Sequence, residues 1–363
     1  MPAILPTLAA GVPDGAADVL LRAATRALDR ARHHDLATMR ELAVPDDHRP
    51  DERLRAMLRT RFAAAIAPIE RDLRLGAAAR LAAMQAAAAA ERLLDDAEPV
   101  VSALTTLAAT DDPSILADLL ADVRLEALAE ALPAGMPAGA GLNADQPSLL
   151  VRLVGCPEPD VAAAASELLA VQSRRGATVA PVLPPATRER LVWWTAALLR
   201  VRLGDDPRAD HALVEAASDL LVETPGAVSV AAAAMRLAGL VHARPDELPM
   251  LLLEALGDRQ PVLFVALLAQ ASGLDFEAVR AALTDVAGDR LWLLLRAQDM
   301  DRSTIARIGV ALADADARRD LDRFVAALDA AMAIAPERAA AVFAAATLHP
   351  AYRAALAAVA ALR

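Results

Sequence analysis

Histidine and carboxylate side chains gather in the first part of the chain, where they could bind a metal ion. His33 and His34 are adjacent and are followed by Asp35. A second polar group comes after them: Asp46, Asp47, His48, Asp51 and Glu52. Adjacent residues on a helix point about 100° apart, so His33 and His34 cannot easily face one ion. We therefore interpret this region as a solvated polar end of a helix, and we predict no metal and no cofactor.

His33 or His34 could instead accept a phosphoryl group, which is the chemistry of a histidine phosphotransfer bundle. Asp35 follows the histidines directly, and helices expected at residues 16–42, 51–67 and 76–97 could complete such a bundle. No extended signature of that class accompanies the histidines. Phosphotransfer at His33 or His34 therefore stands as the alternative function.

Arginine is dense just beyond these residues, in a cluster that could serve binding. Its members are Arg49, Arg53, Arg55, Arg59 and Arg61. A guanidinium pairs bidentately with a carboxylate, so the cluster could receive an acidic partner. The neighbouring acidic residues partly offset its charge, which favours a solvated, salt-bridged helix face. Arg53 and Arg59 are the candidate interaction residues.

Two adjacent tryptophans, Trp193 and Trp194, form another candidate for binding. Neighbours on a helix point in different directions, so one ring could lie at the surface and anchor a protein interface. Packing of at least one ring in the core is the other interpretation. Both tryptophans are candidate interaction residues.

Motifs of the common enzyme classes do not occur in the sequence. Gly-x-Gly is found only as Gly139-Ala140-Gly141, where no strand is expected, and no nucleophile elbow is centred on a serine. Cys156 is the only cysteine, so no intrachain disulfide can form, as is typical of a reducing cytoplasm. We predict a non-catalytic cytoplasmic protein.

The charge of the chain limits its partners. The 363 residues carry a formal net charge of -11, and arginine provides every basic side chain because lysine is absent. Binding to nucleic acid or to anionic lipid needs a basic surface, so we expect neither partner. Charged residues interrupt each apolar run before the roughly 20 residues that a membrane-spanning helix needs. We expect a protein partner, and the oligomeric state is left open.

The elements that position these residues are predicted to be helices throughout. Hydrophobic residues make up 56% of the chain but aromatic residues only 2%, and alanine and leucine fill most apolar positions. A β-sheet protein would need more β-branched and aromatic residues. Acid–proline pairs such as Asp112-Pro113 and Asp206-Pro207 mark helix starts. These features predict an all-α fold.

A Gly- and Pro-rich segment, residues 133–147, is the predicted domain boundary. Residues 1–132 form the predicted N-terminal helical region. Residues 148–363 form pairs of expected helices with short connections, for example 187–203 with 208–222 and 261–272 with 276–285. Such a series predicts a HEAT-like α-solenoid of antiparallel helix pairs. No clean period in residue identity emerges, so an irregular helical array describes the pattern equally well.

Local signals within this second region are specific. Trp292 lies in an apolar run, Leu291–Leu295, and a helix that is apolar all round predicts a central, buried position. Gly273, which Leu274 follows, predicts a helix stop in a left-handed conformation. Asp275 is then expected to cap the next helix.

Three segments of the C-terminal part resemble a known family. They are residues 149–165, with the turn Pro157-Glu158-Pro159-Asp160-Val161, and residues 244–274 and 287–309. In this order, over about residues 148–321, they resemble an alphaproteobacterial helical-repeat family that is a conserved domain of unknown function. The resemblance implies an all-helical, HEAT-like scaffold that serves as a protein-interaction or regulatory module. It carries over no catalytic motif.

Overall fold

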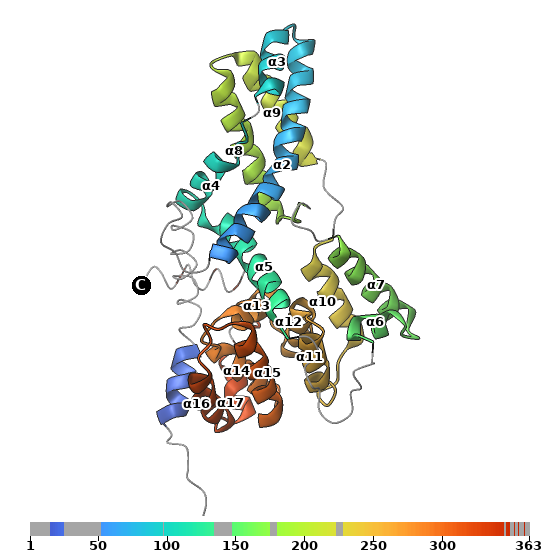
Figure 1. Cartoon of the computed structure of the whole chain (residues 1–363), viewed down its shortest axis with the longest axis vertical. Coiled ribbons are helices and arrows are strands. Elements are labelled where there is room, and N and C mark those ends of the chain that lie inside the picture. The colour runs from blue at the N-terminus through green and yellow to red at the C-terminus, as the bar shows by residue number, and fades with distance from the viewer. Residues whose placement is uncertain are drawn as a thin grey trace, which may run out of the picture. The chain divides into compact units, whose positions relative to one another are not determined.

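The fold is built from helices. The computed structural model describes residues 15–24, 52–96, 98–133, 147–174, 180–222, 228–344 and 346–348, together with residues 352, 355 and 359. Every regular element among these residues is an α-helix, which confirms the predicted all-α class (Figure 1). None of the described helices is both long and apolar enough to cross a membrane.

Many of the described helices follow one another with short connections. After a helix at residues 15–24, the first group comprises α2 (Glu52–Ala83), α3 (Ala87–Asp95), α4 (Val101–Thr110), α5 (Pro113–Ala131), α6 (Leu149–Val154), α7 (Pro159–Ser173), α8 (Pro185–Leu203) and α9 (Pro207–Val222). The second group comprises α10 (Val230–Val241), α11 (Leu248–Gly257), α12 (Pro261–Ser272), α13 (Phe276–Thr284), α14 (Asp289–Ala297), α15 (Arg302–Ala315), α16 (Leu321–Met332) and α17 (Pro336–Ala341).

Contacts divide the chain into two compact units, and neither is continuous in sequence. The first unit comprises Met1–Arg32, Ala127–Ser166 and Ala234–Arg363, and the second comprises His33–Glu126 and Glu167–Ala233. The predicted domains, 1–132, 133–147 and 148–363, follow the Gly- and Pro-rich segment instead. The units group the residues differently because α8 and α9 pack against α2, which lies far from them in sequence. The linker stays a prediction, since residues 134–146 lie outside the described part.

Helix α2 is the centre of the second unit. It packs against α3, α4, α8 and α9, and it carries one continuous apolar stripe. The stripe consists of Leu58, Phe62, Ile66, Ile69 and Leu73, all at most 6% exposed. Its spacing of three and four residues is that of an amphipathic helix. The stripe runs past Pro68, which lacks a backbone N–H, so burial on both sides of the proline keeps the helix continuous.

The expectation of separate helices at 51–67 and 76–97 is wrong. The helix continues through Gly76 and ends at Ala83, and the break comes at Gln85, whose φ is 59°. A Cβ at position 76 would lie 3.3 Å from the Cβ of Ala216 on α9. Gly76 therefore permits the close approach of α9 to α2, a role that depends on a helix distant in sequence.

The first unit is organised around α12 and α14. Residues Val262–Ala269 of α12 are all at most 6% exposed, and α12 packs against α11 and α13. On α14, Trp292 is 2% exposed, and its ring centroid lies 4.7 Å from that of Phe324 on α16. The prediction that the helix around Trp292 is central and buried is confirmed.

The predicted helix ends in this unit are also confirmed. Gly273 follows α12 in the left-handed conformation, with a φ of 67°. The side chain of Asp275 accepts a hydrogen bond from the N–H of Ala278 at 2.7 Å, so it caps α13. Asp301 caps α15 in the same way through the N–H of Thr304, at 2.7 Å.

The packing within the first unit is partly sequential. Each of α11 to α15 contacts the next helix along the chain, as short connections favour. Helix α14 also contacts α16 and α17, and α11 contacts α15. In a regular solenoid each repeat contacts its neighbours alone. The all-α statement therefore holds, and the HEAT-like arrangement stays a prediction.

Substitution of Gly309 tests this core. Gly309 lies on α15, and a Cβ there would overlap the ring of Phe324, which Trp292 contacts from another helix. We expect Gly309→Ala to lower the free energy of unfolding by about 1–3 kcal/mol, because overpacking outweighs the gain in helix propensity. Urea denaturation followed by circular dichroism measures the change.

Gly239 on α10 provides the matched control. A Cβ there would meet its nearest neighbour, Oε1 of Gln270, at 4.0 Å. Without overlap, Gly239→Ala is expected to raise the free energy of unfolding by about 0.5–1 kcal/mol through helix propensity. Equal shifts in the two variants would contradict the described packing around Phe324.

Candidate functional site

Helix α8 carries an apolar strip that faces solvent. Trp193, Ala197 and Val201 recur every four residues, so they lie along one face of the helix. Trp193 is 36% exposed and Val201 is 72% exposed, and Ala197 is exposed as well. A rise of 1.5 Å per residue makes the strip about 12 Å long. We call these three residues the α8 strip.

The opposite face of α8 is buried in the second unit, against α2, α3, α4 and α9. Its buried residues are Thr187, Leu191, Val192, Thr195, Ala196, Leu199 and Leu203. The hydroxyl of Thr195 donates to the carbonyl of Leu191 at 2.7 Å, so this buried polar group is satisfied. Burial of one face fixes the rotation of the helix and therefore the direction in which the α8 strip points.

Arginines hold the N-terminal half of α8. Arg188 donates to the backbone carbonyl of Leu220 on α9 at 2.7 Å. Arg190 forms an ion pair with Asp112, which immediately precedes α5. These guanidinium groups link α8 to two neighbouring segments of the second unit.

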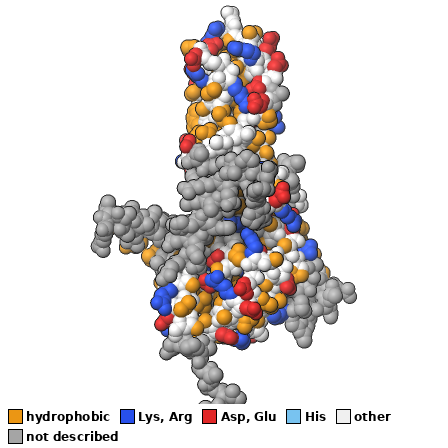
Figure 2. Space-filling view, turned by 60° about the vertical axis from the view of Figure 1, so that its left-hand side comes forward, with side chains coloured by type: hydrophobic (Ala, Val, Ile, Leu, Met, Phe, Trp, Pro, Cys, Tyr) orange, Lys and Arg blue, Asp and Glu red, His pale blue; other side chains and the backbone are white. Residues whose placement is uncertain are grey.

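Arg200 and the carboxylates around it occupy the other end of α8. Its Nε donates to Asp210 at 2.8 Å, and Asp205 accepts a second hydrogen bond. Asp210 and then Asp205 raise the pKa of Arg200 above its usual value through these bonds. Acidic and basic side chains are likewise interspersed on the face drawn in Figure 2. Arg200 is therefore neutralised beside the α8 strip.

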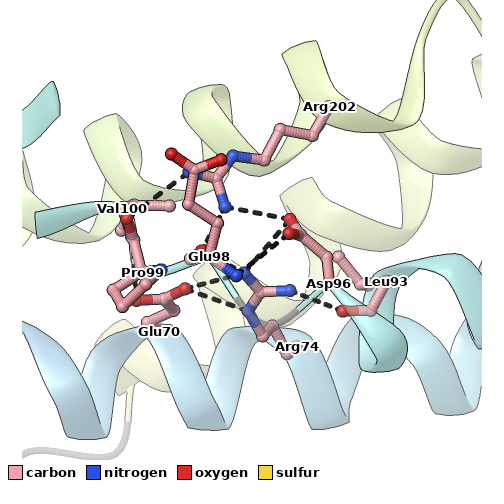
Figure 3. Close-up of polar contacts among 8 residues, drawn as sticks. All are labelled: Glu70, Arg74, Leu93, Asp96, Glu98, Pro99, Val100 and Arg202. Atoms are coloured by element: carbon pink, nitrogen blue, oxygen red, sulfur yellow. Dashed lines mark hydrogen bonds and ion pairs between the residues drawn. The ribbon is translucent and has the colours of Figure 1, made fainter.

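Arg202 connects the end of α8 to the segment between α3 and α4 (Figure 3). One of its terminal nitrogens donates to Oδ2 of Asp96 at 2.9 Å and to the backbone carbonyl of Glu98. The other terminal nitrogen donates to the carbonyl of Pro99 at 3.4 Å. One guanidinium thus binds three residues of this connection, Asp96, Glu98 and Pro99.

Arg74 on α2 reaches the same carboxylate from the other side (Figure 3). Its Nη2 lies 3.4 Å from Oδ2 of Asp96 and 2.7 Å from Oε1 of Glu70, and its Nη1 donates to the carbonyl of Leu93 at 2.6 Å. The second oxygen of Glu70 accepts the N–H of Val100 at 3.2 Å. Asp96 therefore stands between arginines of α2 and α8.

The pKa of Asp96 reflects this position. Burial by itself would raise the pKa of the carboxyl group, since it disfavours the charged form. The hydrogen bond from Arg202, the N–H of Glu98 and the positive charges of Arg202 and Arg74 outweigh burial, so the pKa of Asp96 is lowered. The folded chain favours the carboxylate.

The structure places the predicted tryptophans differently from one another. Trp193 is at the surface in the α8 strip, and Trp194 is half-buried. Trp194 is thus the more shielded of the two, and the interpretation that at least one ring packs in the core stays a prediction. Their roles in binding stay predictions.

The predicted arginine cluster divides between surface and interior. Arg53 and Arg59 are exposed on α2, as expected for interaction residues. Arg55 and Arg61 are only 5% and 8% exposed, so they do not belong to a solvated helix face. A nitrogen of Arg61 donates to both carboxylate oxygens of Glu126 at 2.9 Å, which explains how its charge is tolerated in the interior.

His33 and His34 lie outside the described residues, and phosphotransfer at either histidine stays a prediction. Among the residues that the structure does describe, no group of three or more His, Cys, Asp or Glu side chains is placed to hold a metal ion.

Sequence reasoning missed the residues that position α8. A local signal did exist for Glu70 and Arg74, because carboxylate and guanidinium four residues apart pair on a helix. Asp96 and Arg202 carry no such signal, since they lie 106 residues apart and meet only through packing. Their pairing could not be read from local spacing.

The described residues define an all-α protein in which an apolar helix face rests on an ion-paired frame. The chain belongs to the family described as Uncharacterised protein conserved in bacteria (DUF2336), which matches residues 142–344. The match covers more than half of the chain and includes α8 and α9. It confirms the predicted membership of a family of unknown function. No curated protein and no solved structure matches the chain.

Asp96→Asn tests the ion pairs that join α2 and α8 through Asp96. Loss of the carboxylate removes the links to Arg74 and Arg202, so we expect the free energy of unfolding at pH 7 to fall by about 1 kcal/mol. The lowered pKa of Asp96 means that its contribution is complete above the unfolded value of about 3.9 and is lost as the pH falls through the folded value. The difference between wild type and variant should therefore close in acid, as measured by urea denaturation from pH 7 to pH 3.

Asp95→Asn is the matched control, because Asp95 is the exposed neighbour of Asp96 at the end of α3. We expect its stability to follow that of the wild type at each pH. A difference for Asp96→Asn that stayed constant down to pH 3 would contradict the role assigned to the Asp96 carboxylate.

Proposed function

We propose that the chain is a non-catalytic protein-interaction scaffold of the cytoplasm, and that the α8 strip is a docking surface for a helix of a protein partner. The observation that carries the proposal is the exposure of Trp193 and Val201 on one face of a helix whose other face is buried. Exposed tryptophans are frequent anchors of protein interfaces. A strip with helical spacing suits an amphipathic partner helix.

The size of the three side chains supports this choice of partner. Ala197 is small and lies between the larger Trp193 and Val201, so a bulky side chain of the partner could fit between them. An indole ring is rigid and offers a large apolar area at low cost in conformational entropy.

The charges around the strip support docking as well. Arg190 and Arg200 are already engaged by carboxylates of the same unit. A partner that covers the α8 strip would therefore meet these two guanidinium groups with their charges already balanced, which avoids the cost of enclosing them unpaired at an interface. The hydrogen bonds and ion pairs of Arg188, Arg190, Arg200 and Arg202 keep the α8 strip in place before binding. This order reduces the entropy lost on association.

We also propose that residues 148–363 form a HEAT-like array, as the resemblance to an alphaproteobacterial helical-repeat family implies. The sequential contacts from α11 to α16 support it. Arrays of this kind present extended surfaces to protein partners, which agrees with a role as a scaffold.

Trp193→Ala tests the docking surface. Truncation of an interface anchor typically costs about 2 kcal/mol or more, so we expect at least a roughly 30-fold weaker complex. The tagged chain is used to capture partners from native cells, which mass spectrometry identifies, and the affinity for the partner is then measured with purified proteins. Circular dichroism checks that the variant is folded.

Met250→Glu serves as the control, because Met250 is a 59% exposed apolar residue on α11 in the first unit. It should leave the partners and their affinity unchanged, whereas Val201→Glu should weaken binding as Trp193→Ala does. Capture of the same proteins at the same affinity by folded Trp193→Ala and Val201→Glu would refute the proposed surface.

A further inference from the structure

The second unit contains a cavity of about 310 Å³, and the residues of the α8 strip are not among its described lining residues. Its walls come from α2, α5, the end of α7 and the start of α10, together with residues 180–182 and 228–229. The volume lies at the lower end of the range of about 300 to 1,000 Å³ that is typical of small-molecule sites. Its size therefore suits a small organic ligand.

Most of the cavity wall is apolar. The apolar lining residues include Leu119, Val171, Pro181, Val182, Val230 and Ala231. Small-molecule sites commonly combine such a lining with a few polar groups that fix the orientation of the ligand. The wall favours a ligand with an apolar body.

Among the described residues that line the cavity, two are arginines, and they differ in their partners. The charge of Arg61 is balanced by Glu126, whose two oxygens both accept from one nitrogen at 2.9 Å. Arg174 donates through Nε to the backbone carbonyl of Ala170 at 3.1 Å, and no described carboxylate forms an ion pair with it. Arg174 therefore offers a cation at the cavity that an anionic ligand group could neutralise.

We propose that this cavity binds a small amphiphilic oxyanion, with its head group at Arg174 and a short apolar body against Val171, Val182 and Val230. A guanidinium recognises carboxylate and phosphate oxygens through paired hydrogen bonds, so either head group fits. Asp122 also lines the cavity, and its negative charge limits how strongly an anion is held. The site is independent of the α8 strip and of the proposed function as a scaffold.

Octanoate is the probe for this site, and isothermal titration calorimetry on the full chain measures its binding. We expect saturable binding of octanoate, with octanol and octylamine binding at least about fivefold more weakly because they lack the anionic group. Octyl phosphate carries a phosphate in place of the carboxylate head group. It should compete with octanoate for the same site. Equal binding of octanoate, octanol and octylamine, or no binding of octanoate, would overturn the proposal.

Variants of Arg174 and Asp122, which carry opposite charges, test the location of the site. Arg174→Gln should weaken octanoate binding about fivefold, and Asp122→Asn should strengthen it, since the two side chains act on the anion with opposite sign. Arg92→Gln, at an exposed position on α3, should leave it unchanged. An affinity that Arg174→Gln leaves at the wild-type value would place the ligand elsewhere and refute the proposal.

Variants that fill the cavity test its interior. Val171→Phe should abolish octanoate binding, and Ala231→Leu, at a half-buried position on α10, provides a milder change if Val171→Phe does not fold. Circular dichroism and thermal unfolding check each variant. Wild-type affinity in a folded Ala231→Leu variant would show that the ligand does not occupy the cavity.

Discussion

The arrangement of the second unit depends on one carboxylate that two arginines share. Asp96 lies between Arg74 of α2 and Arg202 of α8, at the connection that leads from α3 to α4. Burial of one face sets the rotation of these helices, but surfaces made mostly of alanine and leucine specify the register along the helix axis less precisely, because their side chains are chemically uniform. A polar link with defined donors and acceptors selects one register of α8 against α2. Without it, apolar burial alone would bring α2 and α8 together less specifically.

The chemistry of arginine suits this task. Arg74 contacts the side chain of Glu70, the side chain of Asp96 and the backbone carbonyl of Leu93. A guanidinium has five N–H donors in a rigid plane, whereas an ammonium group is a compact point charge. In a chain without lysine, each cation has this forked geometry. The composition is then of structural use, whatever its origin, because a single guanidinium can join several helices.

Local patterns predicted the helices well because the helix ends carry local signals. Gly273 and Asp275 mark the end of α12 and the start of α13, and the apolar run around Trp292 marks a buried helix. Prediction failed where the outcome depends on a distant partner. Gly76 is a position where α9 approaches α2, and neither the continuity of α2 nor the burial of Arg61 can be deduced without the facing helix.

The same limit applies to the candidate site. The residue types of Trp193 and Trp194 predicted a role in binding, but spacing alone could not show which ring lies at the surface. That choice follows from the rotation of α8, which the burial of Leu191, Thr195 and Leu199 sets on one side.

Helix α8 has two separable roles. The helix is bound to the rest of the second unit by Arg188, Arg190, Arg200 and Arg202. Its other face exposes Trp193, Ala197 and Val201 to solvent. The residues of one set are not the residues of the other, so the exposed face can change its side chains while the frame keeps the helix in position. A surface of this kind can be adapted to a partner without loss of the fold, since exposed substitutions typically alter stability by less than about 0.5 kcal/mol. This separation of the two sets is the physical reason for proposing that the α8 strip binds a partner while the ion pairs of α8 give structural support.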